Sequence, residues 1–258
     1  MTAVSLKALA SIDKQACAAL RDSLIQERYA VISIDDASAQ TALVEAVNQF
    51  DPEQTFRFPA RDGISNYDET NKACFGILYR AALTFTQAIL EAEPSLTESF
   101  PVVAQSLAEA LHPDFKLFAG EDTNAPFSSA DAPFAHTFFN IFNYDHGMLN
   151  EHKDRGLVTA IYISPNKSGS QSVSQLWVGR GNNDWVAMDA LVDGGQFVVF
   201  VGEELEEMGK QVGLDFLAVE HSVRVVPHGE YVSHSHQRRD PDAQASGNRK
   251  SAALVLCS

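Results

Sequence analysis

The sequence predicts an α+β fold in which an N-terminal helical layer packs on a jelly-roll barrel, or double-stranded β-helix. Two observations support this class. Residues 1–130 carry segments with apolar side chains at helical spacing, whereas residues 131–258 carry many short β-like runs separated by Gly, Asn, Asp and Pro turns. Short strands at this spacing are typical of a barrel or sandwich rather than of alternating βαβ units. We therefore expect a single domain over residues 1–258, with a helical part (1–130) and a jelly-roll core (131–258).

The bulk composition limits the classes of partner. A formal net charge of −15 argues against a nucleic-acid backbone or an anionic membrane as the main partner. The three cysteines are widely separated and odd in number, which argues against a disulfide framework or a zinc-thiolate site. The N-terminus lacks the pattern of a signal peptide, and no stretch approaches transmembrane length. These features predict a cytoplasmic protein.

The N-terminal half has four segments with the apolar spacing of amphipathic helices, at 12–27, 37–50, 72–92 and 96–111. The strongest is 72–92, whose apolar stripe indicates a core-packing helix that ends before Pro94. A strand is expected at 29–34. Residues 51–70 are polar and aromatic with two prolines, so we expect a loop, and a loop of this length is a candidate lid over a binding site.

In the C-terminal half, β-like runs are expected at 134–144, 157–163, 173–178, 184–188, 196–201, 217–226, 230–236 and 251–257. A Gly-, Pro-, Asp- and Ser-rich connection at 113–131 separates them from the helical half. The acidic segment 203–207 is expected to form an exposed face.

The strongest chemical signal is the pair His152 and Asp154, which stand one residue apart before the apolar segment 157–163. Residues i and i+2 of a strand project to the same face, so the imidazole and the carboxylate would converge. His221 interrupts the β-like run 217–226, and a barrel can bring it back to the same place. Two histidines and one carboxylate with open positions are the facial-triad ligands of non-haem Fe(II) oxygenases.

A second signal opens the last strand. Arg249 and Ser251 share a strand face by the same i, i+2 rule. A guanidinium binds a carboxylate bidentately, and a neighbouring hydroxyl adds one more donor. The pair therefore suits the distal carboxylate of a dicarboxylic acid.

These motifs occur in an order that resembles a known family. Residues 138–256 are similar to the Fe(II)/2-oxoglutarate-dependent dioxygenases of the isopenicillin N synthase-like group. The motifs that carry the resemblance are His152-Lys-Asp154-Arg-Gly-Leu-Val-Thr159, Gln175-Leu-Trp177-Val, Trp185-Val, Gly194-Gly-Gln-Phe-Val-Val-Phe-Val-Gly202-Glu203, Glu220-His221-Ser-Val-Arg-Val and Arg249-Lys-Ser251.

The resemblance implies an enzyme that uses Fe(II), 2-oxoglutarate and O2 to hydroxylate, desaturate or demethylate a small organic molecule, with release of succinate and CO2. Because the carboxylate at 154 is present, halogenation is not expected. The implied iron ligands are His152, Asp154 and His221, and the implied 2-oxoglutarate residues are Arg249, Ser251, Tyr144 and Asn143, with Asn140 as the alternative to Asn143.

The chain also departs from the family pattern. Residues 226–248 stand between the distal histidine and Arg249 as an insertion, so Arg224, Arg238 and Arg239 are possible substitutes for that arginine. The lid segment 51–70 and the insertion are the first and second candidates for substrate contacts. The substrate residues that we expect there are Phe58, Arg61, Tyr67 and Arg238.

Three alternatives remain open. One is an Fe(II) oxidase on the same scaffold that does not use 2-oxoglutarate. Another is a zinc hydrolase with the same three ligands, for which Glu151 or Glu220 would supply the general base. The last is a metal-free binding module. The sequence does not determine the oligomeric state or the substrate.

Overall fold

The computed structural model of the chain describes residues 3–49, 56–59, 69–112, 134, 136–144, 149–164, 174–192, 196–225 and 249–258. Within these ranges the protein combines helices with two β-sheets, as the sequence predicts. The three cysteines, Cys17, Cys74 and Cys257, are buried and free.

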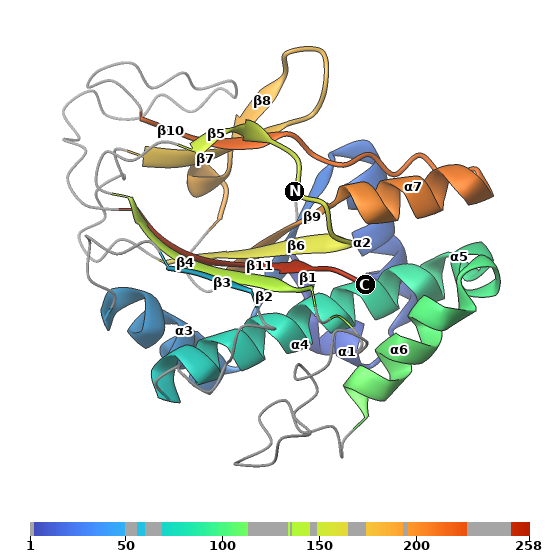
Figure 1. Cartoon of the computed structure of the whole chain (residues 1–258), viewed down its shortest axis with the longest axis horizontal. Coiled ribbons are helices and arrows are strands. Elements are labelled where there is room, and N and C mark those ends of the chain that lie inside the picture. The colour runs from blue at the N-terminus through green and yellow to red at the C-terminus, as the bar shows by residue number, and fades with distance from the viewer. Residues whose placement is uncertain are drawn as a thin grey trace.

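The two sheets lie one above the other (Figure 1). In order across the large sheet, the strands are β1 (Val4–Ser5), β2 (Tyr29–Ser33), β9 (Gln196–Val201), β6 (Val158–Ile163), β11 (Arg249–Leu256), β4 (Phe138–Tyr144) and β3 (Phe56–Pro59). In order across the small sheet, they are β5 (Leu149–His152), β10 (His221–Val225), β7 (Ser174–Gly179) and β8 (Trp185–Ala187). The large sheet thus draws strands from both sides of residue 130.

The middle strands of the large sheet are buried on both faces. In β11, Ala252 and Leu254 belong to the core beneath the helices, whereas Ala253 belongs to a second core between the two sheets. Side chains of a strand alternate between its faces, so each strand contributes to both cores. This double burial explains why β6 is apolar and buried along its whole length.

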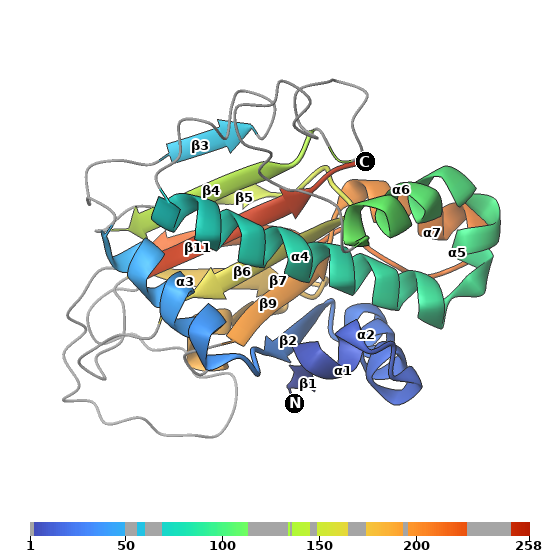
Figure 2. The same cartoon turned by 90° about the horizontal axis from the view of Figure 1, so that it is seen from below.

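The helices α2 (Lys14–Gln26), α3 (Ala37–Gln49) and α4 (Glu69–Ala92) cover the face of the large sheet that points away from the small sheet (Figures 1 and 2). The helix α4 crosses the middle of that face and contacts β11 and β6. The helices are α1 (Leu6–Ala10), α2 (Lys14–Gln26), α3 (Ala37–Gln49), α4 (Glu69–Ala92), α5 (Pro94–Ser99), α6 (Pro101–Leu111) and α7 (Glu203–Val212), with a short 3-10 turn at Met188–Ala190.

The expectation that no segment reaches transmembrane length is wrong for α4. This helix of 24 residues is long and apolar enough to cross a membrane by length and composition. However, 72% of its most apolar window is buried inside the protein. Its ring contacts, such as Phe75 with Phe139 of β4 and Phe85 with Phe197 of β9, lie at the interface with the sheet. These contacts identify α4 as the core helix expected from its apolar stripe.

Several boundaries differ from the expectations. The predicted helix 96–111 is two helices, because Pro101 has no N–H to donate and begins a new helix. The predicted loop 51–70 contains β3, which pairs with β4. The predicted strand 217–226 begins only at His221, and β5 was not predicted. The predicted strand 230–236 lies outside the described residues.

The acidic segment 203–207 is the first half of α7 and is not a uniformly exposed face. Glu206 is 12% exposed, and its carboxylate accepts hydrogen bonds from Nζ of Lys210 and the N–H of Ala218, each at 2.8 Å. Burial by itself raises the pKa of Glu206, but the Lys210 and Ala218 hydrogen bonds and the charge of Lys153 outweigh it and hold this pKa below its usual value. The Ala218 contact anchors the connection that leads into β10.

We expect Glu206→Gln to lower the free energy of unfolding at pH 7 by about 1 kcal/mol, the typical net value of such a hydrogen bond. Because the folded-state pKa of Glu206 is depressed, its contribution is present above the unfolded pKa of about 4.3 and is lost as pH falls through the folded pKa. The difference from the wild type, measured by urea unfolding, should therefore shrink as the pH falls below the unfolded pKa and through the lower folded pKa. Glu207→Gln, at an exposed position of the same helix, is the matched control.

Candidate metal centre

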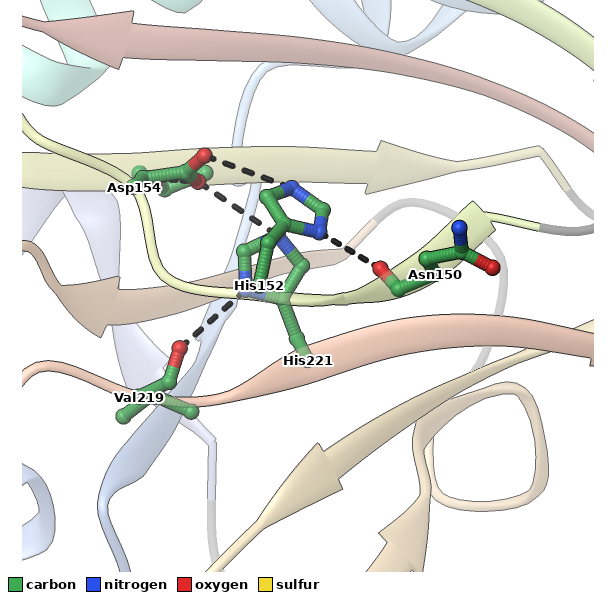
Figure 3. Close-up of polar contacts among 6 residues, drawn as sticks. Asn150, His152, Asp154, Val219 and His221 are labelled. Carbon is green, nitrogen blue, oxygen red and sulfur yellow. Dashed lines mark hydrogen bonds and ion pairs between the residues drawn. The ribbon is translucent and has the colours of Figure 1, made fainter.

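The three predicted metal ligands lie together where β5 ends and β10 begins. His152 is the last residue of β5, His221 is the first residue of β10, and the two are directly paired across the antiparallel strands. Asp154 lies in the connection from β5 to β6. The candidate ligand atoms of all three residues lie within 4.8 Å of one another (Figure 3).

The geometry differs from the predicted strand in one respect. His152 and Asp154 do not share a single strand that continues into β6, because β5 ends at His152 and β6 begins at Val158. The chain turns between the strands and aims the carboxylate at both rings. Asp154 Oδ1 lies 3.7 Å from Nε2 of His152, and Oδ2 lies 3.5 Å from Nε2 of His221.

Both imidazoles are oriented by backbone carbonyls (Figure 3). Nδ1 of His152 lies 2.8 Å from the carbonyl oxygen of Asn150, and Nδ1 of His221 lies 3.2 Å from that of Val219. A carbonyl oxygen can only accept, so each Nδ1 donates to it, and Nε2 is the ring nitrogen that faces the carboxylate of Asp154. Burial lowers the pKa of His221 despite the opposing charge of Asp154, which favours the neutral ring that a metal ion requires.

A buried hydroxyl fixes the carboxylate. Oγ1 of Thr159, in β6, donates a hydrogen bond of 2.6 Å to Oδ2 of Asp154. Thr159 had no role predicted from the sequence, although a hydroxyl within the apolar run 157–163 was a detectable signal. Phe200 of β9 packs its ring against His221, with centroids 4.6 Å apart, and forms an apolar wall of the site. The two imidazoles, the carboxylate and these supports fit a divalent transition metal, and they have the composition of a facial triad.

We expect Thr159→Val to weaken divalent-metal binding by about 10-fold, the lower end of the cost of losing an outer-shell partner. The valine is nearly isosteric, but Asp154 loses the donor that holds its orientation. Titration of the apo protein with Co²⁺ measures the change. Thr86→Val is the matched control, because Thr86 is equally buried and donates to Ala82 within α4, away from the site. An equal effect of both substitutions would contradict the assigned role.

The predicted 2-oxoglutarate residues lie on the paired strands β4 and β11. The register pairs Arg249 with Tyr144 and Lys250 with Asn143. Ser251 is buried, and its register partners Phe142 and Ile163 belong to the core between the sheets. Side-chain positions of Arg249, Tyr144 and Asn143 lie outside what the structure describes, so their roles stay predictions.

Arg224, a possible substitute for Arg249, does not point toward the predicted 2-oxoglutarate residues. It lies three residues after His221 in a regularly paired part of β10, so it projects from the opposite face of the small sheet. There its guanidinium donates to the carboxylate of Glu151 at 2.8 Å. Arg238 and Arg239, the other substitutes, lie outside the described residues, as do the candidate substrate residues Arg61 and Tyr67. Phe58 lies in β3, and only its backbone is described.

No family model matches the chain, and no curated protein matches it. Several solved structures match the chain. A Neurospora crassa thymine hydroxylase in complex with α-ketoglutarate has a TM-score of 0.58 at 12% identity, covering 100% of this chain and 85% of that one. A Shewanella oneidensis protein with a provisional oxygenase assignment has a TM-score of 0.53 at 15% identity, covering 100% and 90% of the two chains. The resemblance to the Fe(II)/2-oxoglutarate oxygenases is thus confirmed at the level of the fold.

Proposed function

We propose that the protein is an Fe(II)- and 2-oxoglutarate-dependent oxygenase that acts on a small organic molecule. The observation that carries this proposal is the site formed by His152, Asp154 and His221, in which the Nε2 atoms of both histidines face one carboxylate. The fold supports it, because the solved structures with this fold include an α-ketoglutarate complex.

The protein's own residues hold and shield the metal in this proposal. The carbonyls of Asn150 and Val219 keep the Nδ1 protons, Thr159 fixes the carboxylate, and Phe200 limits the access of water to His221. An Fe(II) ion bound there supplies the activation of O2 that is coupled to oxidation of 2-oxoglutarate to succinate and CO2. Arg249 and Ser251 bind the distal carboxylate of 2-oxoglutarate, with Tyr144 and Asn143 nearby.

We further propose that the two facing sheets are the halves of a jelly-roll barrel, with the site at one end of the space between them. The reaction is hydroxylation, desaturation or demethylation. The thymine hydroxylase with this fold has been solved with thymine and with 5-formyluracil, which favours a small molecule here. A cytoplasmic location remains part of the proposal.

The zinc-hydrolase alternative is weakened by the position of its general base. Glu151 projects away from the ligands and pairs with Arg224, and this pairing holds its carboxylate on the opposite face of the small sheet. Glu220, the other candidate, is exposed. The other alternative, an oxidase that does not use 2-oxoglutarate, would have the same iron site. The titration described next distinguishes it from the main proposal.

The test is anaerobic titration of the protein with Fe(II), with and without 2-oxoglutarate, while following the weak visible charge-transfer band of the chelate. We expect the band only when both are present, and we expect Arg249→Ala to abolish it. Lys250→Ala is the matched control, because Lys250 is the adjacent cation in β11 and its Nζ donates to the carbonyl of Asn48. Iron binding without the band would favour the oxidase, and no iron binding would refute the oxygenase.

A further inference from the structure

We propose that Arg224 is a positioning residue for the metal ligand His152, and that it acts through its ion pair with Glu151. The proposal rests on the proposed metal site but concerns residues on the other face of the small sheet. It follows from an irregularity in β5 that decides which way His152 points.

The irregularity is a β-bulge between β5 and β10. Val223 is paired with Leu149 and His221 with His152, so three residue steps in β5 oppose two steps in β10. Leu149 packs against the core between the sheets. In a regular strand, a residue three positions later would project to the opposite face. The extra residue of the bulge therefore turns His152 back to the inner face, beside His221.

The bulge consists of Asn150 and Glu151, and both have partners that stabilise it. The carbonyl of Asn150 accepts the Nδ1 proton of His152. The carboxylate of Glu151 accepts from the guanidinium of Arg224 at 2.8 Å. Arg224 lies in β10, the strand that carries His221, so the ion pair joins the two strands that carry the histidines.

The side chain of Arg224 is also held by contacts that do not involve Glu151. Its Nε donates to Oγ of Ser222 at 2.9 Å. Its guanidinium carbon lies 4.1 Å from the ring centroid of Trp185 and 5.6 Å from that of Trp177. Cation–π contacts with two rings fix the plane of the guanidinium, so little side-chain freedom remains to be lost when it binds the carboxylate.

The ion pair is partly exposed, with Arg224 36% and Glu151 58% accessible. Exposed ion pairs contribute little to global stability. We therefore expect this pair to act mainly on the local backbone conformation of β5. Loss of the pair frees the bulge to relax toward regular pairing, which moves His152 away from His221 and Asp154. The expected consequence is weaker metal binding with little change in unfolding.

The experiment compares Arg224→Met with Arg21→Met. Both substitutions remove a partly exposed arginine that pairs with a glutamate, since Arg21 lies 2.9 Å from Glu93 on the helical side of the protein. Co²⁺ is titrated into each apo protein, and its visible spectrum reports the coordination. We expect the dissociation constant to rise about 10-fold for Arg224→Met, in the range for outer-shell partners, and to stay unchanged for Arg21→Met. Arg224→Lys keeps the charge but loses the Nε hydrogen bond to Ser222 and the planar contact with the Trp rings, so its affinity should fall between those of the wild type and Arg224→Met.

A second measurement is independent of the metal. Histidine-selective ¹⁵N NMR of the apo protein, with the His152 signals assigned by His152→Asn, should show those signals shifted in Arg224→Met and unshifted in Arg21→Met. Unshifted His152 signals in Arg224→Met would overturn the proposal, and so would wild-type Co²⁺ affinity in that variant. If the wild type binds no Co²⁺ but the His152 signals shift, Arg224 positions His152 and the proposed metal function fails.

Discussion

Replacing His221 by Asn should abolish divalent-metal binding and lower turnover by more than about 100-fold, beyond the usual cost of losing an outer-shell partner. His221 is the most buried of the three ligands, with 5% of its side chain exposed. Its Nε2 faces the carboxylate of Asp154, and its ring is fixed by Val219 and Phe200. Asparagine can replace the hydrogen bond to Val219, but it cannot place a nitrogen lone pair at the position of Nε2.

The measurement is the thermal stability of each protein with and without Co²⁺. A ligand present at 100 times its dissociation constant stabilises the wild type by about 2.7 kcal/mol, which corresponds to roughly 5–10 °C for a chain of this size. The His221→Asn variant should show no such increase. His136→Asn, at an exposed position, should behave as the wild type does. A Co²⁺-dependent increase retained in His221→Asn would show that the ion binds elsewhere.

Replacing Gly202 by Ala should destabilise the protein by about 3 kcal/mol, the upper range for overpacking a filled site. A Cβ on Gly202 would lie 2.0 Å from the carbonyl oxygen of Gly156 and 3.0 Å from that of Asp154. Both contacts are with backbone that cannot rotate away. The φ of Gly202 is −95°, so the cost arises from close approach and not from backbone strain.

The same clash should disturb the metal site. Gly202 is the N-cap of α7, and the N–H of Glu203 donates to the carbonyl of Asp154 at 2.8 Å. Moving the two backbones apart therefore displaces Asp154 from the histidines. We expect the midpoint of thermal unfolding to fall by roughly 6–12 °C and Co²⁺ binding to weaken in the same variant.

Gly213→Ala is the control for Gly202→Ala. Gly213 ends α7 at a φ of 78° with open space around it, so alanine there costs about 1–2 kcal/mol of backbone strain. It should lower stability without changing Co²⁺ affinity. Equal losses of affinity in the two variants would show that affinity follows global stability and not the contact between Gly202 and the loop of Asp154.

Local patterns in the sequence were sufficient to predict those features in which the environment of each residue depends on residues close to it in the chain. The apolar stripe of 72–92 required a buried helix, and α4 is that helix. The apolar run after Asp154 predicted a strand at 157–163, and β6 is that strand. The three candidate ligands were also identifiable, because few residue types bind metals and their order matched a known pattern.

Other features depend on contacts between residues far apart in the sequence. The acidic start of α7 was predicted to be an exposed face, but the N–H of Ala218 donates a hydrogen bond to the carboxylate of Glu206. Residues 56–59 were predicted to be part of a loop, but they form a strand because they pair with β4. Arg224 reads as a possible carboxylate ligand, but strand pairing places it on the opposite face from His221.

The sequence by itself determined that the fold combines helices with β-sheets, the position of the core helix and the identity of the three candidate metal ligands, because these depend on composition, periodicity and order. Only the tertiary structure decided how the ligands converge. The spacing of His152 and Asp154 suggested one regular strand, whereas a bulge in β5 turns His152 inward and a separate turn aims Asp154 at both rings. A bulge is defined by the register between two strands, and the strand that opposes β5 lies about 70 residues away in the sequence.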